Sequence, residues 1–208
     1  MNSGRIVIVD YGMGNLHSVI YKIAKLHADV VISSSSEEIR SASKIILPGV
    51  GHFAAGMKRI YELDIKKSLD YKALEEKVPV LGICLGMQLM TDHSEEGNVE
   101  GLGWIPAMTK RFEKEKLNGL KIPHMGWNTI KKENDPLNIL DGMEPDDMFY
   151  FVHSFFVECK KSENVLCSST YGINFHSGIV RENISGLQFH PEKSHDSGTV
   201  ILKNFINL

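Results

Sequence analysis

The 208-residue chain has only three cysteines, Cys84, Cys159 and Cys167, and their spacing does not repeat. An odd number of cysteines without a regular spacing argues against a disulfide framework and indicates a reducing compartment. Cys159 and Cys167 are interpreted as packing residues. The sequence also has no Cys-x-x-Cys pair and no two histidines at helical i, i+4 spacing. We therefore expect no metal site.

Long apolar runs and a strong excess of one charge are missing as well. No stretch is apolar enough to span a bilayer. The 23 Lys and Arg against 26 Asp and Glu give a net charge of −3, which does not indicate a nucleic-acid surface. The first residues lead directly into the apolar run Ile6–Val9 rather than into a signal peptide, so we expect a cytoplasmic protein.

A dinucleotide-binding fingerprint is suggested at Gly12 and Gly14 but is incomplete. Position 17 is His where the third glycine belongs, and the second predicted strand ends at Ile32-Ser33 without an acidic residue for a ribose. The sequence therefore predicts no dinucleotide site, and no cofactor is expected.

Short apolar runs alternate with amphipathic stretches in the first half of the chain, which is typical of βα units on a parallel sheet. Beyond Gly97, short strand-like runs separated by Gly, Asn, Lys and Pro indicate an antiparallel extension. We predict one α/β domain over residues 1–208, with a central, mostly parallel sheet flanked by helices. The predicted strands are Ile6–Val9, Val30–Ile32, Ile45–Leu47, Val78–Ile83, Met148–Val152, Val165–Ser169 and Ile184–Phe189.

Helices are predicted where apolar residues recur at helical spacing. Leu16, Val19, Ile20, Ile23 and Leu26 form one such face. Further predicted helical segments are a short helix after Ser35, with Ser35 and Glu38 as a capping box, a helical region over 54–74, and a final helix over 198–206.

The segment Gly82–Gly86 has the pattern Gly-x-Cys-x-Gly after the apolar run Val78–Leu81. This is the cysteine version of a strained turn from strand to helix, in which small neighbours leave a nucleophile exposed above a sheet. A thiol there also lies at a helix N-terminus, which favours the thiolate. Cys84 is thus a candidate nucleophile, and a buried packing cysteine is the alternative.

Two other segments supply matching chemistry. His190 and Glu192 follow the predicted strand Ile184–Phe189 and provide a general base with a carboxylate to orient it. Pro48–Gly51 follows another strand, and its glycines suit a loop whose N–H groups, at Val50 or Gly51, form an oxyanion hole with the Leu85 N–H. Taken singly, each segment is also compatible with an ordinary surface turn.

Together, Pro48–Gly51, Gly82–Gln88 and Gln188–Ser194 resemble the class I (triad-type) glutamine amidotransferases. Within this family, four further segments are similar to the glutaminase subunits of imidazole glycerol phosphate synthases: 10–16, 94–97, 123–128 and 149–154. The resemblance runs nearly end to end and implies one glutamine amidotransferase domain.

The resemblance implies a Cys84-His190-Glu192 triad that hydrolyses glutamine. It further implies that Gln88, Glu96 and the Ser154 region contact the substrate. Because free ammonia is protonated in water and becomes a poor nucleophile, a consumer must be docked over the site. In the resembling family this partner is a (β/α)₈-barrel synthase subunit, which makes an imidazole glycerol phosphate from a ribulosylamine intermediate. The matching interface positions are Asn15, Trp127, Tyr150 and Lys193, although Trp127 and Tyr150 are also compatible with core aromatics.

Three alternatives stay open. Departures from the commoner pattern at 91–93, 103–105 and 121–122 also suit a relative that supplies ammonia for amidation of a bacterial surface sugar. A non-catalytic binding subunit is disfavoured by the intact Cys84, His190 and Glu192. A stand-alone cysteine hydrolase is disfavoured by the full set of glutaminase motifs.

Overall fold

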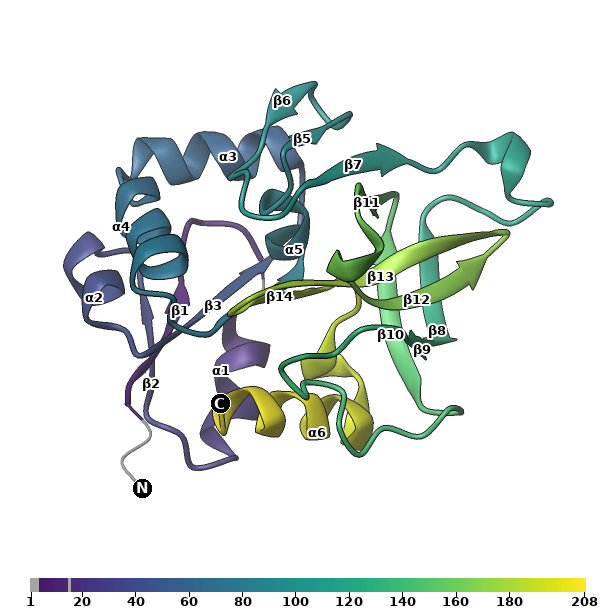
Figure 1. Cartoon of the computed structure of the whole chain (residues 1–208). Coiled ribbons are helices and arrows are strands. Elements are labelled where there is room, and N and C mark those ends of the chain that lie inside the picture. The colour runs from purple at the N-terminus through teal and green to yellow at the C-terminus, as the bar shows by residue number, and fades with distance from the viewer. Residues whose placement is uncertain (1–3, 15) are drawn as a thin grey trace.

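The computed structural model describes residues 4–14 and 16–208. Within them, twelve strands form one sheet and two further strands form a small second sheet, with helices on both faces of the larger sheet (Figure 1). This confirms the predicted α/β fold with a mostly parallel centre and an antiparallel extension.

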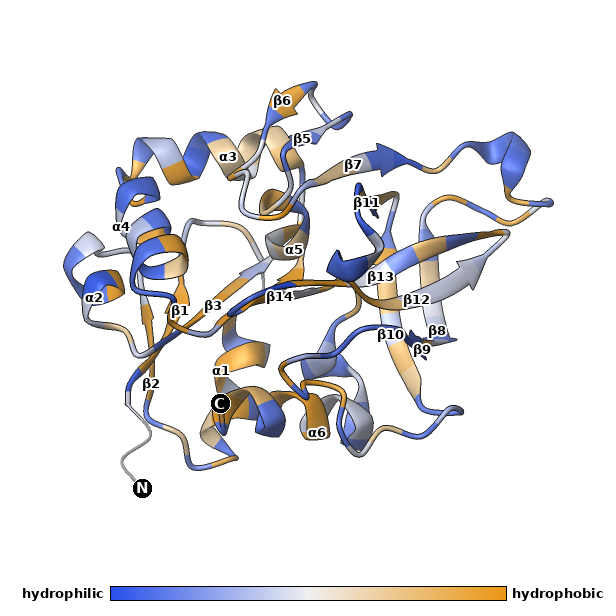
Figure 2. Cartoon of the chain, viewed as in Figure 1, coloured by the Kyte–Doolittle hydropathy of each residue, from blue (hydrophilic) through white to orange (hydrophobic). Residues whose placement is uncertain are grey.

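The parallel half of the sheet has the order β2-β1-β3-β4-β14. Its strands are β1 (Ile6–Val9), β2 (Val30–Ser33), β3 (Lys44–Gly49), β4 (Val80–Cys84) and β14 (Ile184–Leu187). Strands β1, β3, β4 and β14 are buried along their whole length, as expected for parallel strands covered on both faces. Figure 2 shows these central strands as largely apolar.

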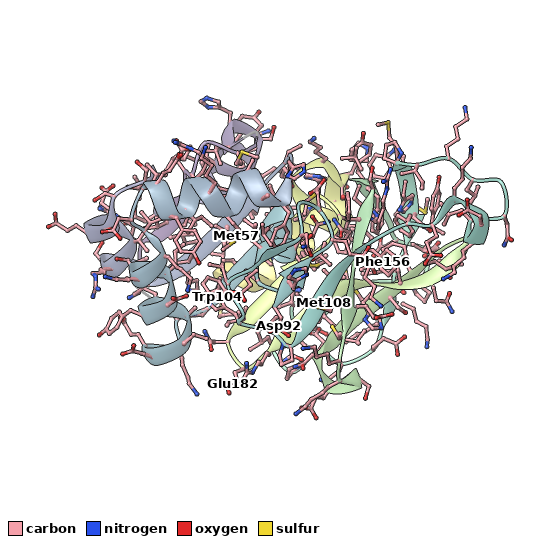
Figure 3. All side chains as sticks on the ribbon, turned by 90° about the horizontal axis from the view of Figure 1, so that it is seen from above. Met57, Asp92, Trp104, Met108, Phe156 and Glu182 are labelled. Atoms are coloured by element: carbon pink, nitrogen blue, oxygen red, sulfur yellow. The ribbon has the colours of Figure 1, made fainter. Side chains whose placement is uncertain are left out.

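Successive residues of β1 point to opposite faces of the sheet, where two separate cores form. Val7 and Val9 pack in the core beneath α2 (Ser36–Ser41), α3 (Phe53–Glu62), α4 (Lys66–Asp70) and α5 (Leu85–Leu89). Ile6 and Ile8 pack in the core beneath α1 (Leu16–Ala24) and α6 (His195–Ile206). Met57 of α3 and Trp104, both buried in the first core, are labelled in Figure 3.

The predicted helical region 54–74 is divided into α3, α4 and a π-helical turn, η1 (Tyr71–Glu75). Asp64 has a φ of 51°, which ends α3 and redirects the chain. The apolar period continues across this break, since Ile60, Ile65 and Leu69 all reach the same core. Periodicity alone therefore does not reveal where one helix ends and the next begins.

The predicted capping box at α2 is only half formed. Ser35 Oγ accepts a hydrogen bond from the Glu38 N–H at 3.4 Å. The Ser35 N–H donates instead to Ser33 Oγ at 2.9 Å, so Glu38 does not close the box. The final helix, α6, begins three residues earlier than predicted, at His195. The predicted strand Val78–Ile83 runs instead over Val80–Cys84.

The antiparallel half continues from β14 through β13, β11 and β7. The predicted strands over 148–152 and 165–169 are confirmed, although the first belongs to the separate sheet, where β8 pairs with β10. The remaining elements are β5 (His93–Ser94), β6 (Val99–Glu100), β7 (Ala107–Arg111), η2 (Lys114–Lys116), β8 (His124–Thr129), β9 (Lys131–Lys132), β10 (Met148–His153), β11 (Phe155–Cys159), η3 (Ser162–Asn164), β12 (Val165–Tyr171), β13 (Ile173–Arg181) and η4 (Pro191–Lys193).

Candidate active site

Cys84 lies at the turn between β4 and α5, with φ 53° and ψ −109°. A non-glycine residue rarely adopts this conformation, and here the neighbours enforce it. A Cβ on Gly86 would overlap the Leu47 carbonyl oxygen, and one on Gly82 would lie 2.8 Å from the Met87 nitrogen. The two glycines of the Gly-x-Cys-x-Gly pattern are thus required by close approach of the backbone.

His190 and Glu192 lie at the same edge of the sheet, because β14 runs parallel to β4 and both strands end there. His190 Nδ1 is 2.8 Å from Glu192 Oε1, and the two side chains are only 2% and 4% exposed. The backbone around them is anchored as well. The His190 N–H donates to the Tyr150 carbonyl at 2.9 Å, and Ser194 Oγ donates to the His190 carbonyl at 2.6 Å.

The electrostatic environment favours a charged imidazole at His190. Burial by itself lowers the pKa of His190, but the adjacent Cys84 side chain and the Glu192 carboxylate outweigh it, so that the pKa is raised above its ordinary value. A proton transferred from Cys84 to His190 would therefore be stabilised by both neighbours. The arrangement is suited to a thiolate-imidazolium pair oriented by a carboxylate.

Pro48–Gly51 lies next to Cys84, since Gly49 at the end of β3 is in register with Cys84 at the end of β4. The loop after β1 packs on this segment: a Cβ on Gly14 would lie 3.1 Å from the Val50 nitrogen. Gly51 has a φ of 129°, which only glycine adopts readily. Leu85, on the other side of Cys84, begins α5, where N–H groups have no helical acceptor.

Gln88 is buried on α5, and both hydrogens of its side-chain amide are engaged. Its Nε2 donates to the Phe155 carbonyl at 3.1 Å and to Gln188 Oε1 at 3.0 Å. Only its Oε1 is left for a ligand, so Gln88 is suited to accept a hydrogen bond from an ammonium or amide group.

Glu96 and Ser154 are the other two residues expected to contact the substrate. Glu96 Oε2 accepts a hydrogen bond of 2.7 Å from the N–H of Phe53, the first residue of α3 and two residues beyond Gly51. Ser154 is partly buried and lines a groove of about 1100 Å³, together with Glu95 and Lys110. Cys84 is not among the residues that line this groove.

Trp127, Tyr150 and Lys193 form one patch beside the site. The Trp127 and Tyr150 rings are 5.9 Å apart, and Lys193 Nζ lies 5.6 Å from the centre of the Tyr150 ring. The Tyr150 ring is in turn 6.4 Å from that of His190. Trp127 is 43% exposed, so the alternative of a core aromatic is wrong for it. Asn15, the fourth predicted interface position, lies outside the described residues.

Two residues near Cys84 were missed in the sequence. Gln188 is fully buried with its Nε2 3.7 Å from Cys84 Sγ. Tyr11 is fully buried too, and its hydroxyl lies so close to Gly49 that a Cβ there would overlap it. Burial, and secondly the charge of Cys84, raise the pKa of Tyr11. Tyr11 lies in segment 10–16 and Gln188 in Gln188–Ser194, which both carry the family resemblance. The atoms that their polar groups contact are distant in sequence, so the pattern does not predict these contacts.

The described residues contain no group of three or more His, Cys, Asp or Glu side chains placed to hold a metal ion. None of the helices described here is both long and apolar enough to cross a membrane.

Residues 7–208 match the family described as glutamine amidotransferase class-I. The chain belongs to the family of class I glutamine amidotransferases. Within it, the chain is 44% identical over 201 residues to the imidazole glycerol phosphate synthase subunit HisH of Bdellovibrio bacteriovorus, covering 96% of this chain and 98% of that protein. It is 46% identical over 201 residues to subunit HisH 2 of Methanococcus maripaludis, covering 97% and 98%.

Solved structures with the same fold are more distant in sequence. A chain of PurLQS from Thermotoga maritima aligns with a TM-score of 0.71 at 17% identity, covering 98% of this chain and 98% of that one. The glutaminase domain of a Trypanosoma brucei CTPS aligns with a TM-score of 0.68 at 16% identity, covering 97% and 92%. At these identities the likeness concerns the fold alone.

Proposed function

We propose that this chain is the glutaminase subunit of an imidazole glycerol phosphate synthase. It hydrolyses glutamine to glutamate and ammonia and passes the ammonia to a (β/α)₈-barrel synthase subunit for histidine biosynthesis in the cytoplasm. The high identity to HisH subunits over nearly the whole chain supports the pathway. The observation that carries the chemistry is the buried His190-Glu192 pair beside a strained Cys84.

In the first half of the reaction, the Cys84 proton passes to His190 and the thiolate attacks the glutamine carboxamide. A sulfur-carbon bond forms, and the carbonyl oxygen becomes an oxyanion. The Leu85 N–H and an N–H at Val50 or Gly51 stabilise this charge. His190 then returns its proton to the leaving nitrogen, so that ammonia departs and a γ-glutamyl thioester remains.

In the second half, His190 acts as a base and takes a proton from water, which attacks the thioester. Collapse of the tetrahedral intermediate breaks the sulfur-carbon bond and releases glutamate. Throughout, the Glu192 carboxylate holds the Nδ1–H of His190, which keeps Nε2 available for the proton transfers.

We assign the amino-acid end of glutamine to Gln88, Glu96 and Ser154. Gln88 offers only its Oε1, and Glu96 keeps one carboxylate oxygen beyond the one that binds the Phe53 N–H. Both groups are therefore acceptors, which is the chemistry needed by an α-ammonium group. Ser154, between β10 and β11, would add a hydroxyl as the third polar group.

The partner is proposed to dock over the patch of Trp127, Tyr150 and Lys193, with Asn15 as a further contact. This patch is suited to an interface because aromatic and basic groups gather beside the ring of His190. Met125 and Met148 lie on the two-stranded sheet of β8 and β10, which also carries Trp127 and Tyr150. They are 61% and 41% exposed and extend the apolar area of the patch. Aromatic and Met side chains are enriched at such interfaces.

The test is a reconstitution with amide-labelled glutamine. The chain is mixed with a barrel protein of histidine biosynthesis and its ribulosylamine substrate, and the label is followed into product by mass spectrometry. We expect labelled imidazole glycerol phosphate, and we expect Cys84→Ser to lose it with glutamine yet retain product formation with an ammonium salt. Labelling of a sugar by a surface-sugar amidation partner, with no labelling by the histidine partner, would instead support the alternative pathway.

A further inference from the structure

The buried side-chain amides of Gln88 and Gln188 are hydrogen-bonded to each other, and that of Gln188 also contacts the sulfur of Cys84. Gln188 follows β14 and has no exposed surface. Its Nε2 lies 3.7 Å from Cys84 Sγ, and its Oε1 accepts a hydrogen bond from Gln88 Nε2 at 3.0 Å. Two amides that are 100 residues apart in sequence are thus linked to Cys84, Gln188 by direct contact and Gln88 through Gln188.

The direction of these hydrogen bonds follows from one atom, the carbonyl oxygen of Phe155. A carbonyl only accepts, so the Gln88 atom 3.1 Å from it must be the amide nitrogen. The second hydrogen of this nitrogen then points to Gln188, whose facing atom must be the oxygen. The Gln188 atom that faces Cys84 is therefore the NH₂ group, a donor.

The Phe155 carbonyl oxygen also accepts a second hydrogen bond, from a histidine. His153 Nδ1 lies 2.7 Å from it, so that this nitrogen carries a hydrogen. His153 Nε2 is consequently an acceptor for His124 Nδ1–H, at 2.9 Å. Burial lowers the pKa of His124 to about 4 and that of His153 to about 3, which keeps both rings neutral and this bonding direction unchanged near neutral pH.

We propose that Gln188 is a further catalytic residue, which donates an N–H to the Cys84 sulfur and stabilises the thiolate, and that Gln88 positions it. An N–H directed at the charged form of a group favours that form. His190 takes the proton from the Cys84 sulfur, and the Gln188 N–H then stabilises the negative charge left on it. The inference rests on the nucleophilic role proposed for Cys84, and it gives Gln88 a second role beside substrate binding.

The experiment measures the rate of Cys84 alkylation by iodoacetamide against pH, with the modified peptide quantified by mass spectrometry. This readout needs neither glutamine nor a partner. Gln188→Met removes the donor with little change in size, and we expect the midpoint of the alkylation profile to rise by about one to two pH units, since a hydrogen bond to a charged group contributes on the order of 1.5–3 kcal/mol and one pKa unit corresponds to about 1.4 kcal/mol. Gln188→Glu replaces the donor with a negative charge and should raise the midpoint further.

The matched control is Asn164→Leu. Asn164 is also a buried amide, but its Nδ2 donates to the Val180 carbonyl at 3.0 Å, away from Cys84. Its substitution should lower stability and leave the alkylation profile unchanged. The other titratable groups that act on this sulfur's surroundings, His190 and Tyr11, are unchanged in all variants.

In the parent protein, the side-chain amide proton resonance of Gln188 should shift with the same midpoint as alkylation, which provides a test independent of any variant's folding. A Gln188 resonance that stays constant through that titration, or a Gln188→Met profile that overlays the parent's, would overturn the inference. Preferential labelling of Cys159 or Cys167 would instead overturn the nucleophile itself, so the two failures are distinguishable.

Discussion

The Nδ1 atom of His190 lies 2.8 Å from Oε1 of Glu192, although only Pro191 separates the two residues. The 3₁₀ turn η4, which begins at Pro191, brings the carboxylate back onto the ring. The histidine therefore carries its orienting group within its own turn. Cys84, the proposed nucleophile, comes from a different strand, and the parallel pairing of β4 with β14 brings it to the same edge of the sheet.

Cys84→Ala and Cys84→Ser are expected to abolish glutamine hydrolysis and leave the fold and partner binding nearly intact. A glutamine-analogue electrophile should label Cys84 alone, because burial raises the pKa of Cys159 and of Cys167 to about 12 and keeps both as thiols. Peptide mapping after labelling is the measurement. A label found mainly on either of those two cysteines would contradict the assignment.

Glu192→Gln should preserve shape and remove the charge that favours imidazolium at His190. We expect turnover with partner present to fall, but by less than the roughly 100- to 10,000-fold loss expected for His190→Ala, which removes the proposed general base itself. Steady-state glutaminase assays of the two variants give the comparison. An unchanged rate for Glu192→Gln would reduce the triad to a dyad of Cys84 and His190.

The isolated chain should be a poor glutaminase. Pro48–Gly51 is rich in glycine, which allows more than one backbone arrangement, so we expect its N–H groups not to be held toward the site in the lone chain. Partner binding would shift that population, and each tenfold gain in the active fraction needs only about 1.4 kcal/mol of differential binding. Glutaminase rates are compared for the chain alone, with partner, and with partner plus acceptor ligand. Full activity of the lone chain would favour a stand-alone hydrolase.

Trp127→Ala should weaken binding of the barrel partner by roughly tenfold or more, as expected for an exposed aromatic anchor. Calorimetric titration of the partner measures the change in Kd. Tyr61→Ala is the matched control, since Tyr61 is also aromatic and exposed but lies on α3, on the other side of the molecule (Figure 1). Equal losses for both variants would argue against this docking face.

Acid should destabilise the fold through the buried pair His124 and His153. Their pKa values are lowered in the folded chain to about 4 and about 3, so between these values and about 6.5 the unfolded chain binds more protons. Stability is therefore lost as the pH falls through that window, by at most about 1.4 kcal/mol per pH unit for each ring. For His153, the charges of His124 and His190 act in the same direction as burial.

Urea unfolding from pH 6.5 downward measures this dependence, and His153→Gln should make it shallower because one titrating ring is removed. His17→Gln, on the exposed side of α1, is the control and should leave the slope as in the parent. Parallel slopes for parent and His153→Gln would show that the pair does not govern acid stability.

Much of the proposed active site was predictable from the sequence, because its parts depend on residues that are close together in the chain. Gly82, Cys84 and Gly86 stand within five residues, and the requirement for glycine on both sides of a strained cysteine is local. The same holds for His190 and Glu192. The parallel pairing that places strand ends at one edge of the sheet followed from the alternating βα pattern.

Other features were decided by the tertiary structure alone. The division of the helical region 54–74 was hidden because both helices bury the same apolar period in one core. The sequence around Trp127 is equally compatible with a buried and an exposed side chain. The side chain is exposed because β8 lies in a separate two-stranded sheet. The direction of the Gln188 amide depends on Gln88 and on the carbonyl of Phe155, which reach it from distant parts of the chain. Sequence pattern determines which side chains are available and which strands align. The donor or acceptor facing a given atom is set by hydrogen bonds between segments that meet only after folding.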